Sequence, residues 1–278
     1  MKLLRNLLKS PMFVIGAGLF FGTLLLALVG PLFADMSLDR VAESYAPPGD
    51  GLLLGADNLG RNYVALLLHG LRNSLYVGFL AGIVATTFGT LVGIYGGFKG
   101  GLIDDLLSVT TNLFIVIPQL ILLILISASM QEGRSLTLIA LIIGATGWTW
   151  SARAVRAQSS ALKSRDHIAL ARINGDGTFA ILLKHILPYL ASYVFMVFII
   201  QVASGILSEA AISMIGIGPL DTQSLGIILN DAKANGALGD GIWWGIFPAT
   251  ILITTIAFSL YLINTSMEGV FNPRLRRE

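Results

Sequence analysis

Apolar runs long enough to cross a lipid bilayer are the feature that most constrains this chain. Residues 12–33 carry no charged side chain, and as a helix rising about 1.5 Å per residue they would span roughly 30 Å of hydrocarbon. In lipid the backbone polar groups must be satisfied within the segment, which favours a helix. Only 12% of the residues are charged, about half of what soluble proteins carry. We therefore expect an all-α, polytopic membrane protein.

Six transmembrane helices are predicted in this chain. They cover approximately residues 12–33, 74–95, 105–130, 136–150, 188–216 and 242–266. Pro118 interrupts the third span and should kink it. Gly78, Gly82, Gly89 and Gly93 line one face of the second span, which predicts close packing against a neighbouring helix.

Most of the 18 Lys and Arg residues precede the first span, follow the last one or fall in the loop 153–187. The positive-inside rule places these segments in the cytoplasm, with both termini. A signal peptide also begins with basic residues followed by an apolar run. The first run is too long for a signal core and lacks a clear cleavage site, so we expect a retained span.

The loop 153–187 is the longest polar interruption of the apolar sequence. Asp166 is predicted to be the N-cap of a two-turn helix that stops at Asn174, with Gly175 after the C-cap. A second short helix should run on until Pro188 ends it. Because a two-turn helix is unstable alone in water, we expect the first one to lie against a partner protein.

The pattern of this loop resembles the coupling loop of ABC importer permeases. It consists of Ala169-Leu170-Ala171, Gly175 and Ile186-Leu187-Pro188. In that family the short helix docks into a groove on a separate ATPase subunit. The resemblance implies a coupling role for seven residues, namely Asp166, Ala169, Leu170, Ala171, Arg172, Gly175 and Pro188.

The family commonly has Glu where this chain has Ala169. Counted from Asp166 as N-cap, Ala169 occupies the N3 position, where a Glu would complete a capping box.

The resemblance extends over nearly the whole chain. Leu54-Gly55-Ala56-Asp57 followed by Gly60-Arg61, the segment 208–218 and Asn272-Pro273-Arg274-Leu275-Arg276 are similar to the second permease subunit of dipeptide, oligopeptide and nickel importers. This implies a type I ABC importer permease fold in a prokaryotic inner (plasma) membrane. Residues 1–72 would be the first span and an external loop, 73–268 the permease core and 269–278 a cytoplasmic tail.

Family membership also implies partners. They would be a sister permease in a heterodimer, two ATPase subunits, an external solute-binding protein and membrane lipid. The solute is expected to be a di- or oligopeptide, with an oligosaccharide or a nickel chelate as the alternative.

Several kinds of chemistry lack their motifs in this sequence. There is no phosphate loop for ATP, no cysteine, no catalytic triad and no facing pair of carboxylates in the spans. His69, His167 and His185 lie in different segments without metal-ligand spacing. The net charge of +2 does not favour nucleic-acid binding. We expect neither catalysis nor a cofactor or metal in this subunit.

Polar side chains within the spans are candidates for a translocation path. They are Asn112, Gln119, Gln201, Ser204 and Glu209. Hydrogen bonds between helices would explain each of them equally well. A secondary transporter is the alternative from another class, but it should place ionisable groups at mid-membrane in several helices and often shows inverted repeats. A channel or structural membrane protein leaves the coupling pattern unexplained.

Asp57 and Arg61 in the external loop have the spacing of an ion pair. We interpret them as a pair four residues apart on a surface helical turn rather than as a substrate contact.

Overall fold

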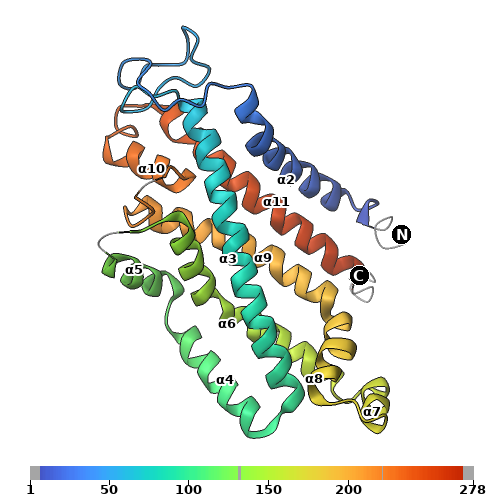
Figure 1. Ribbon diagram of the computed structural model, residues 1–278. Coiled ribbons are helices and arrows are strands. Elements are labelled where there is room, and N and C mark those ends of the chain that lie inside the picture. Colours follow the sequence, from blue (N-terminus) through green and yellow to red (C-terminus); the bar gives the residue numbers. More distant parts are fainter. Residues whose placement is uncertain (1–6, 131–132, 221, 272–278) are drawn as a thin grey trace.

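The computed structural model describes residues 7–130, 133–220 and 222–271, and within them the chain is helical without β-strands (Figure 1). The α-helices are α2 (Pro11–Val29), α3 (Tyr63–Lys99), α4 (Gly101–Val116), α5 (Gln119–Ser129), α6 (Leu136–Leu162), α7 (Asp166–Ile173), α8 (Thr178–Ile181), α9 (Leu187–Met214), α10 (Leu225–Ala234) and α11 (Phe247–Phe271). Two short 3₁₀-helices, η1 (Gly30–Leu32) and η3 (Trp243–Gly245), and a π-helix, η2 (Leu182–Ile186), complete the order. The predicted all-α fold is confirmed.

Five helical stretches are long and apolar enough to cross a membrane on their own. They are Pro11–Leu32, Tyr63–Lys99, Leu136–Leu162, Thr178–Met214 and Trp243–Gly269. Helices α4 and α5 meet the same test only as a pair, bent by 78°. The predicted six spans correspond to these five helical stretches and the bent pair, which together give six spans if α4 and α5 form one span.

Pro118 breaks the third span rather than merely kinking it. Ile117 and Pro118 both have extended backbone angles, with ψ values of 119° and 123°, and α5 starts immediately after them. Proline excludes the residue before it from the helical region and lacks the N–H of the helical ladder. The chain therefore turns sharply at this point.

Three predicted span boundaries are wrong, and one of them is the end of the fourth span, which lies at Leu162 rather than near residue 150. The second span starts at Tyr63 rather than near residue 74, because the side chain of Asn62 accepts a hydrogen bond from Val64 N and caps the helix there. The fifth starts at Thr178, since the chain stays helical through Pro188. In η2 the N–H of Leu187 donates to Leu182 O, five residues back, and this wider turn accommodates a proline without an N–H.

Helix α3 is the central element of the bundle (Figure 1), and its glycines allow neighbouring helices to approach closely. A Cβ atom on Gly93 would lie 2.6 Å from Ala152 O of α6, and one on Gly78 would lie 3.0 Å from Val202 O of α9. Gly82 likewise faces α9 and Gly89 faces α6. The predicted close packing is confirmed, and the glycine face contacts two helices in succession.

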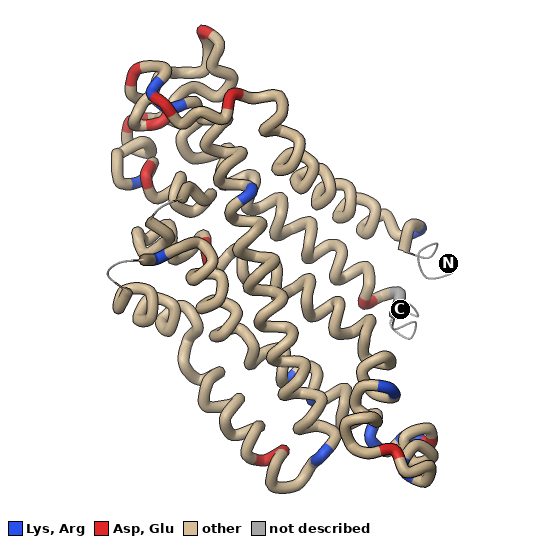
Figure 2. Tube along the Cα trace, viewed as in Figure 1, with Lys and Arg blue, Asp and Glu red and all other residues tan. Residues whose placement is uncertain are grey.

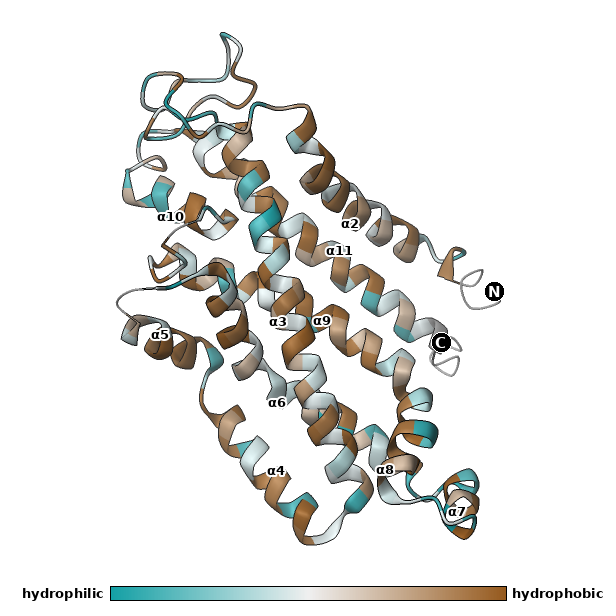
Figure 3. Cartoon of the chain, in the orientation of Figure 1, coloured by the Kyte–Doolittle hydropathy of each residue, from teal (hydrophilic) through white to brown (hydrophobic). Residues whose placement is uncertain are grey.

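Charged residues collect at the two ends of the bundle (Figure 2), and the helices between them are mostly apolar (Figure 3). The loop between α2 and α3 forms one end, and α7 forms the other, which we call the α7 end.

Candidate functional site

Helix α7 is fixed to the bundle on one side and open on the other. Ile168 is fully buried and Ala171 nearly so, in a cluster with Phe98 of α3 and Val155 of α6. On the opposite side Leu170 and Ile173 are 60% and 80% exposed. Leu170 and Ile173, three residues apart, therefore share the outward face of α7, outside the membrane-spanning stretches.

Two ring contacts add to the attachment of α7. The guanidinium of Arg172 lies 5.1 Å from the centre of the Phe98 ring, a distance at which a cation is attracted to an aromatic face. The ring of His167 stacks on Tyr189 of α9 with a centroid separation of 4.6 Å. Helix α7 therefore contacts α3 and α9, and Ile168 and Ala171 join it to the apolar cluster that includes Val155 of α6.

The start of α7 differs from the prediction. Arg165 is the N-cap, and Asp166 is the first helical residue, whose side chain makes no capping hydrogen bond. Ala169 is consequently the fourth residue of the helix, so the capping-box interpretation of this position is wrong. Asp166 still lies in the first turn, where a carboxylate interacts favourably with the helix dipole.

The end of α7 agrees with the prediction. Gly175 follows the C-cap Asn174 with φ of +82°. Asp176 N donates to Ala171 O at 3.0 Å and Gly175 N donates to Arg172 O at 3.1 Å. These two hydrogen bonds define a Schellman motif, whose left-handed residue is usually glycine. Beyond it His185 Nε2 of η2 lies 3.0 Å from Asp176 Oδ2, and Pro188 lies in the first turn of α9.

A cavity of about 360 Å³ opens between the helices. It is lined by residues of α4, α5, α6, α9 and α11 and of the break at Pro118, namely Phe114, Ile115, Ile117, Pro118, Gln119, Leu122, Thr146, Gly147, Thr149, Trp150, Arg153, Ile200, Gln201, Ser204 and Tyr261. Three of the predicted path residues, Gln119, Gln201 and Ser204, thus come together. Gln201 Nε2 also donates to Gly147 O at 2.7 Å, so its amide both joins two helices and lines the cavity.

Asn112 lies beside this cavity rather than in it. It lines a smaller neighbouring cavity of about 60 Å³, and its Oδ1 accepts a hydrogen bond of 2.8 Å from Arg153 Nη2. Arg153 lines both cavities. Sequence reasoning assigned Arg153 to the polar loop because it ended the fourth span at residue 150. The spacing of Thr146, Trp150 and Arg153, which puts them on one helical face, was the signal that could have placed it.

Glu209 is fully buried and does not line the cavity. Its carboxylate accepts hydrogen bonds from Ser74 Oγ of α3 at 3.1 Å and from Ser213 Oγ at 2.6 Å. Ser74 Oγ in turn accepts from Leu225 N at the start of α10. The carboxylate thus joins α3, α9 and α10 through hydrogen bonds, which is the alternative to a role in the translocation path.

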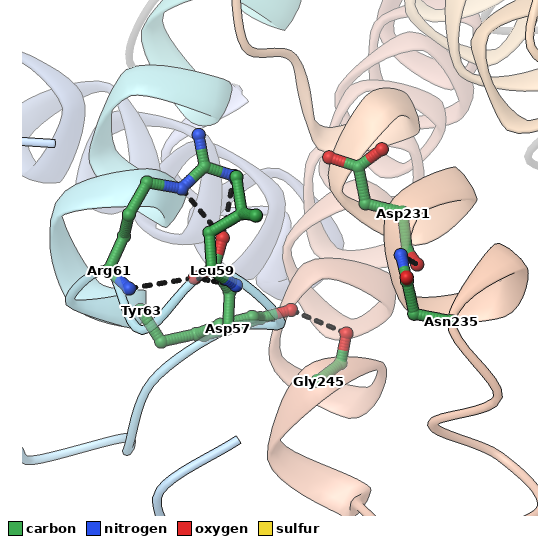
Figure 4. Close-up of polar contacts among 7 residues, drawn as sticks. All are labelled: Asp57, Leu59, Arg61, Tyr63, Asp231, Asn235 and Gly245. Atoms are coloured by element: carbon green, nitrogen blue, oxygen red, sulfur yellow. Dashed lines mark hydrogen bonds and ion pairs between the residues drawn. The ribbon is translucent and has the colours of Figure 1, made fainter. Parts of the chain in front are cut away.

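At the end opposite α7, Asp57 organises a tight turn (Figure 4). Its Oδ1 accepts from the N–H groups of Leu59 and Arg61 at 3.0 and 2.8 Å, and its Oδ2 accepts from Arg61 Nε at 2.7 Å. The predicted ion pair is confirmed, but the residues form a loop rather than a helical turn. The two side chains are only 8% and 13% exposed, so the pair is also not on the surface.

This turn packs against the segment that follows α9. Tyr63 OH donates to Gly245 O at 2.6 Å, and Asp231 of α10 faces the turn (Figure 4). Burial raises the pKa of Asp231, the neighbouring Asp57 carboxylate raises it further, and the charge of Arg61 opposes both. Segments far apart in the sequence thus form one polar cluster.

The three histidines do not share one set of contacts. His69 Nε2 lies 3.2 Å from Met36 O, whereas His167 and His185 belong to the α7 end. In the described ranges no three His, Asp or Glu side chains are placed to hold a metal ion.

The sequence is similar to a known protein family and to several known permeases. Residues 85–277 match the family of binding-protein-dependent transport system inner membrane components. The chain is 27% identical over 276 residues to the dipeptide transport system permease protein DppC of Bacillus subtilis, with 98% of this chain and 85% of that protein covered. It is 31% identical over 232 residues to the oligopeptide transport system permease protein OppC of Mycobacterium bovis, covering 83% and 78%.

A third relative matches almost end to end. This putative peptide transport system permease protein of Brucella abortus is 30% identical over 277 residues, covering 99% of this chain and 92% of the relative. The match to the family spans most of the chain, and the helices are those of a multi-pass membrane protein. The chain therefore belongs to the family of binding-protein-dependent transport system inner membrane components.

Proposed function

We propose that this chain is a permease subunit of an ATP-driven importer of di- or oligopeptides, with α7 as its coupling helix. The names of the relatives support the peptide substrate, since they include dipeptide and oligopeptide permeases. An oligosaccharide or a nickel chelate stays the alternative substrate. Nucleotide hydrolysis belongs to two partner ATPase subunits, and this subunit is not catalytic.

One observation carries the coupling role. Helix α7 buries Ile168 in the bundle and exposes Leu170 and Ile173. A partner that binds Leu170 and Ile173 and then moves would displace Ile168, and through it the apolar cluster formed with residues of α3, α6 and α9. The Schellman turn at Gly175 fixes the direction in which the helix projects. Asp166, Ala169, Ala171, Arg172 and Pro188 hold or orient the same helix and the span after it.

The proposed orientation puts the α7 end and both termini in the cytoplasm. Its support is the excess of Lys and Arg in the loop 153–187 and in the terminal segments of the sequence. The opposite end, with Asp57 and α10, then faces the external solute-binding protein. A sister permease completes the heterodimer, and Gln119, Gln201 and Ser204 line this subunit's share of the path, with Asn112 beside it.

Replacing Leu170 with Asp in the full complex tests the coupling role. A charge placed in an apolar interface must be desolvated, so we expect ATPase binding to weaken by about tenfold or more and transport to fall with it. Leu53→Asp is the matched control for ATPase binding only, since Leu53 is 82% exposed at the opposite end of the molecule. Copurification of the ATPase subunits and uptake into proteoliposomes are the measurements. Normal coupling in Leu170→Asp would show that α7 is not the docking helix.

The same preparation separates an ATP-driven importer from a secondary transporter. Uptake into the proteoliposomes should require both the ATPase subunits and ATP on the side of the membrane where those subunits lie. Uptake by the isolated subunit driven by an ion gradient would contradict the proposal.

A further inference from the structure

Arg153 carries the one formal charge among the described residues that line the 360 Å³ cavity. It lies on α6, one turn beyond Trp150, and its side chain is exposed. The other polar lining side chains are neutral: the amides of Gln119 and Gln201, the hydroxyls of Thr146, Thr149, Ser204 and Tyr261, and the indole N–H of Trp150. A fixed positive charge in a membrane cavity is costly unless water or an anion accompanies it.

The contrast with Arg156, three residues further along α6, shows what Arg153 lacks. Arg156 donates from two nitrogens to the two carboxylate oxygens of Asp104. Arg153 makes one hydrogen bond, to the neutral amide oxygen of Asn112 at 2.8 Å. In the ranges 7–130, 133–220 and 222–271, no ion pair joins Arg153 to a carboxylate.

A guanidinium has five N–H donors in a rigid fork that matches a carboxylate. In Arg153 the bond to Asn112 uses one of them and fixes the direction of the side chain. The other donors of Arg153 make no hydrogen bond to the described residues, and Arg153 lines the cavity. Gln119 and Gln201, which line the same cavity, carry amides of the kind that hydrogen-bond a peptide backbone.

We infer that Arg153 is a carboxylate-binding residue of the translocation path, which takes the free C-terminal carboxylate of a peptide. This inference rests on the proposed peptide import and adds a specificity determinant to it. The carboxylate replaces water on the guanidinium through two parallel N–H···O hydrogen bonds. Asn112 acts as the positioning residue, because it holds the guanidinium without neutralising it.

The test compares uptake of one peptide in two forms, with a free C-terminal carboxylate and with a C-terminal amide. The complete importer with its binding protein is used in proteoliposomes. The binding protein has its own preference, but the same protein serves wild type and variants, so a change in the ratio of the two uptake rates reports on the permease.

We expect Arg153→Gln to reduce uptake of the carboxylate form about tenfold or more relative to the amide form, since a bidentate charge-assisted contact is lost. Arg153→Lys should retain part of the preference, because it keeps the charge but not the fork. Asn112→Ala should reduce the preference less than Arg153→Gln does. Arg72→Gln, an exposed arginine of α3 outside both cavities, should leave the ratio unchanged.

The possible negative results of the uptake comparison distinguish the carboxylate site from the proposed peptide import. Equal loss of both forms in Arg153→Gln, or an unchanged ratio, would overturn the carboxylate site. Dissociation of the two permease subunits in this variant would instead show that Arg153 pairs with the sister subunit, and would also overturn it. If the wild type imports neither form, the proposed peptide import itself is wrong and this inference falls with it.

Discussion

Arg156 of α6 binds both carboxylate oxygens of Asp104 in α4, and Arg156 Nη2 lies 2.8 Å from Asp104 Oδ2. The two residues are 52 positions apart in the sequence. The pair ties the first half of the broken span to α6, and the loop after α6 leads directly into α7. A movement of α7 should therefore reach α4 as well.

Asp104→Asn should loosen this tie. The Asp104 side chain is 17% exposed and the Arg156 side chain 41%, so solvent and salt screen the pair and we expect a loss of only about 0.5–1 kcal/mol of stability. The loss should shrink at high salt. Thermal unfolding of the purified complex at two ionic strengths measures it. Asp105→Asn, at the exposed neighbouring position, keeps both hydrogen bonds of the pair and should change stability less.

Gly93→Leu should prevent the contact between α3 and α6. Even a Cβ atom would lie 2.6 Å from Ala152 O and 2.9 Å from Arg156 N, both backbone atoms that cannot move without shifting a helix. We expect a loss of roughly 3 kcal/mol or more, or failure to assemble. Gly22→Leu makes the same change on α2, where a Cβ meets nothing within 4 Å. Expression level and unfolding temperature should separate the two variants, and similar behaviour would disprove the close packing.

Glu209→Ala should destabilise the junction of α3, α9 and α10 more than Glu209→Gln does. The alanine variant leaves the buried hydroxyls of Ser74 and Ser213 without their shared acceptor, which costs about 1–3 kcal/mol per unsatisfied group. Glutamine keeps an acceptor oxygen at the same place. Unfolding temperatures of both variants, with uptake assays beside them, check the ranking. If both variants keep wild-type stability but lose uptake, Glu209 has a transport role that its burial does not suggest.

The packing of α10 on the loop between α2 and α3 should depend on pH. The pKa of Asp231 is raised in the folded protein, mainly by burial, so its protonated form is favoured there. This contribution to stability is present at low pH and is lost as the pH rises through the raised pKa. Asp231→Asn should remove this part of the pH dependence, seen as the difference from wild type in unfolding temperature across the acidic range. Asp240→Asn, exposed in the segment that follows α10, should retain it.

The sequence predicted several local features correctly. The apolar runs indicated the spans, the glycines of α3 indicated close packing, and Asn174-Gly175 indicated where α7 ends. Each of these depends on residues within a few turns of one another, or on the requirement that a backbone in lipid be helical. For the same reason Pro118 predicted a kink in the third span, but the sequence did not predict that the bend would be as large as 78°.

Other features could not be derived from neighbours in the sequence. The π-helix that carries the chain through Pro188 depends on the packing of Leu182 and Ile186 against α3 and α7, which outweighs the tendency of proline to end a helix. The N-cap of α7 is Arg165, one residue before the predicted Asp166. The residue at which a helix starts depends on the direction of the preceding chain as well as on residue type.

The candidate site shows the same division. The sequence by itself determined that this chain is a helical membrane protein with a short helix inside a basic loop between two spans, since hydrophobicity and charge are properties of contiguous residues. Only the tertiary structure decided that Gln119, Gln201 and Arg153 share a cavity while Glu209 is enclosed between helices. The reason is physical: a polar side chain in a span must face either water or another polar group, and the rotation and crossing of the helices determine which of the two it meets.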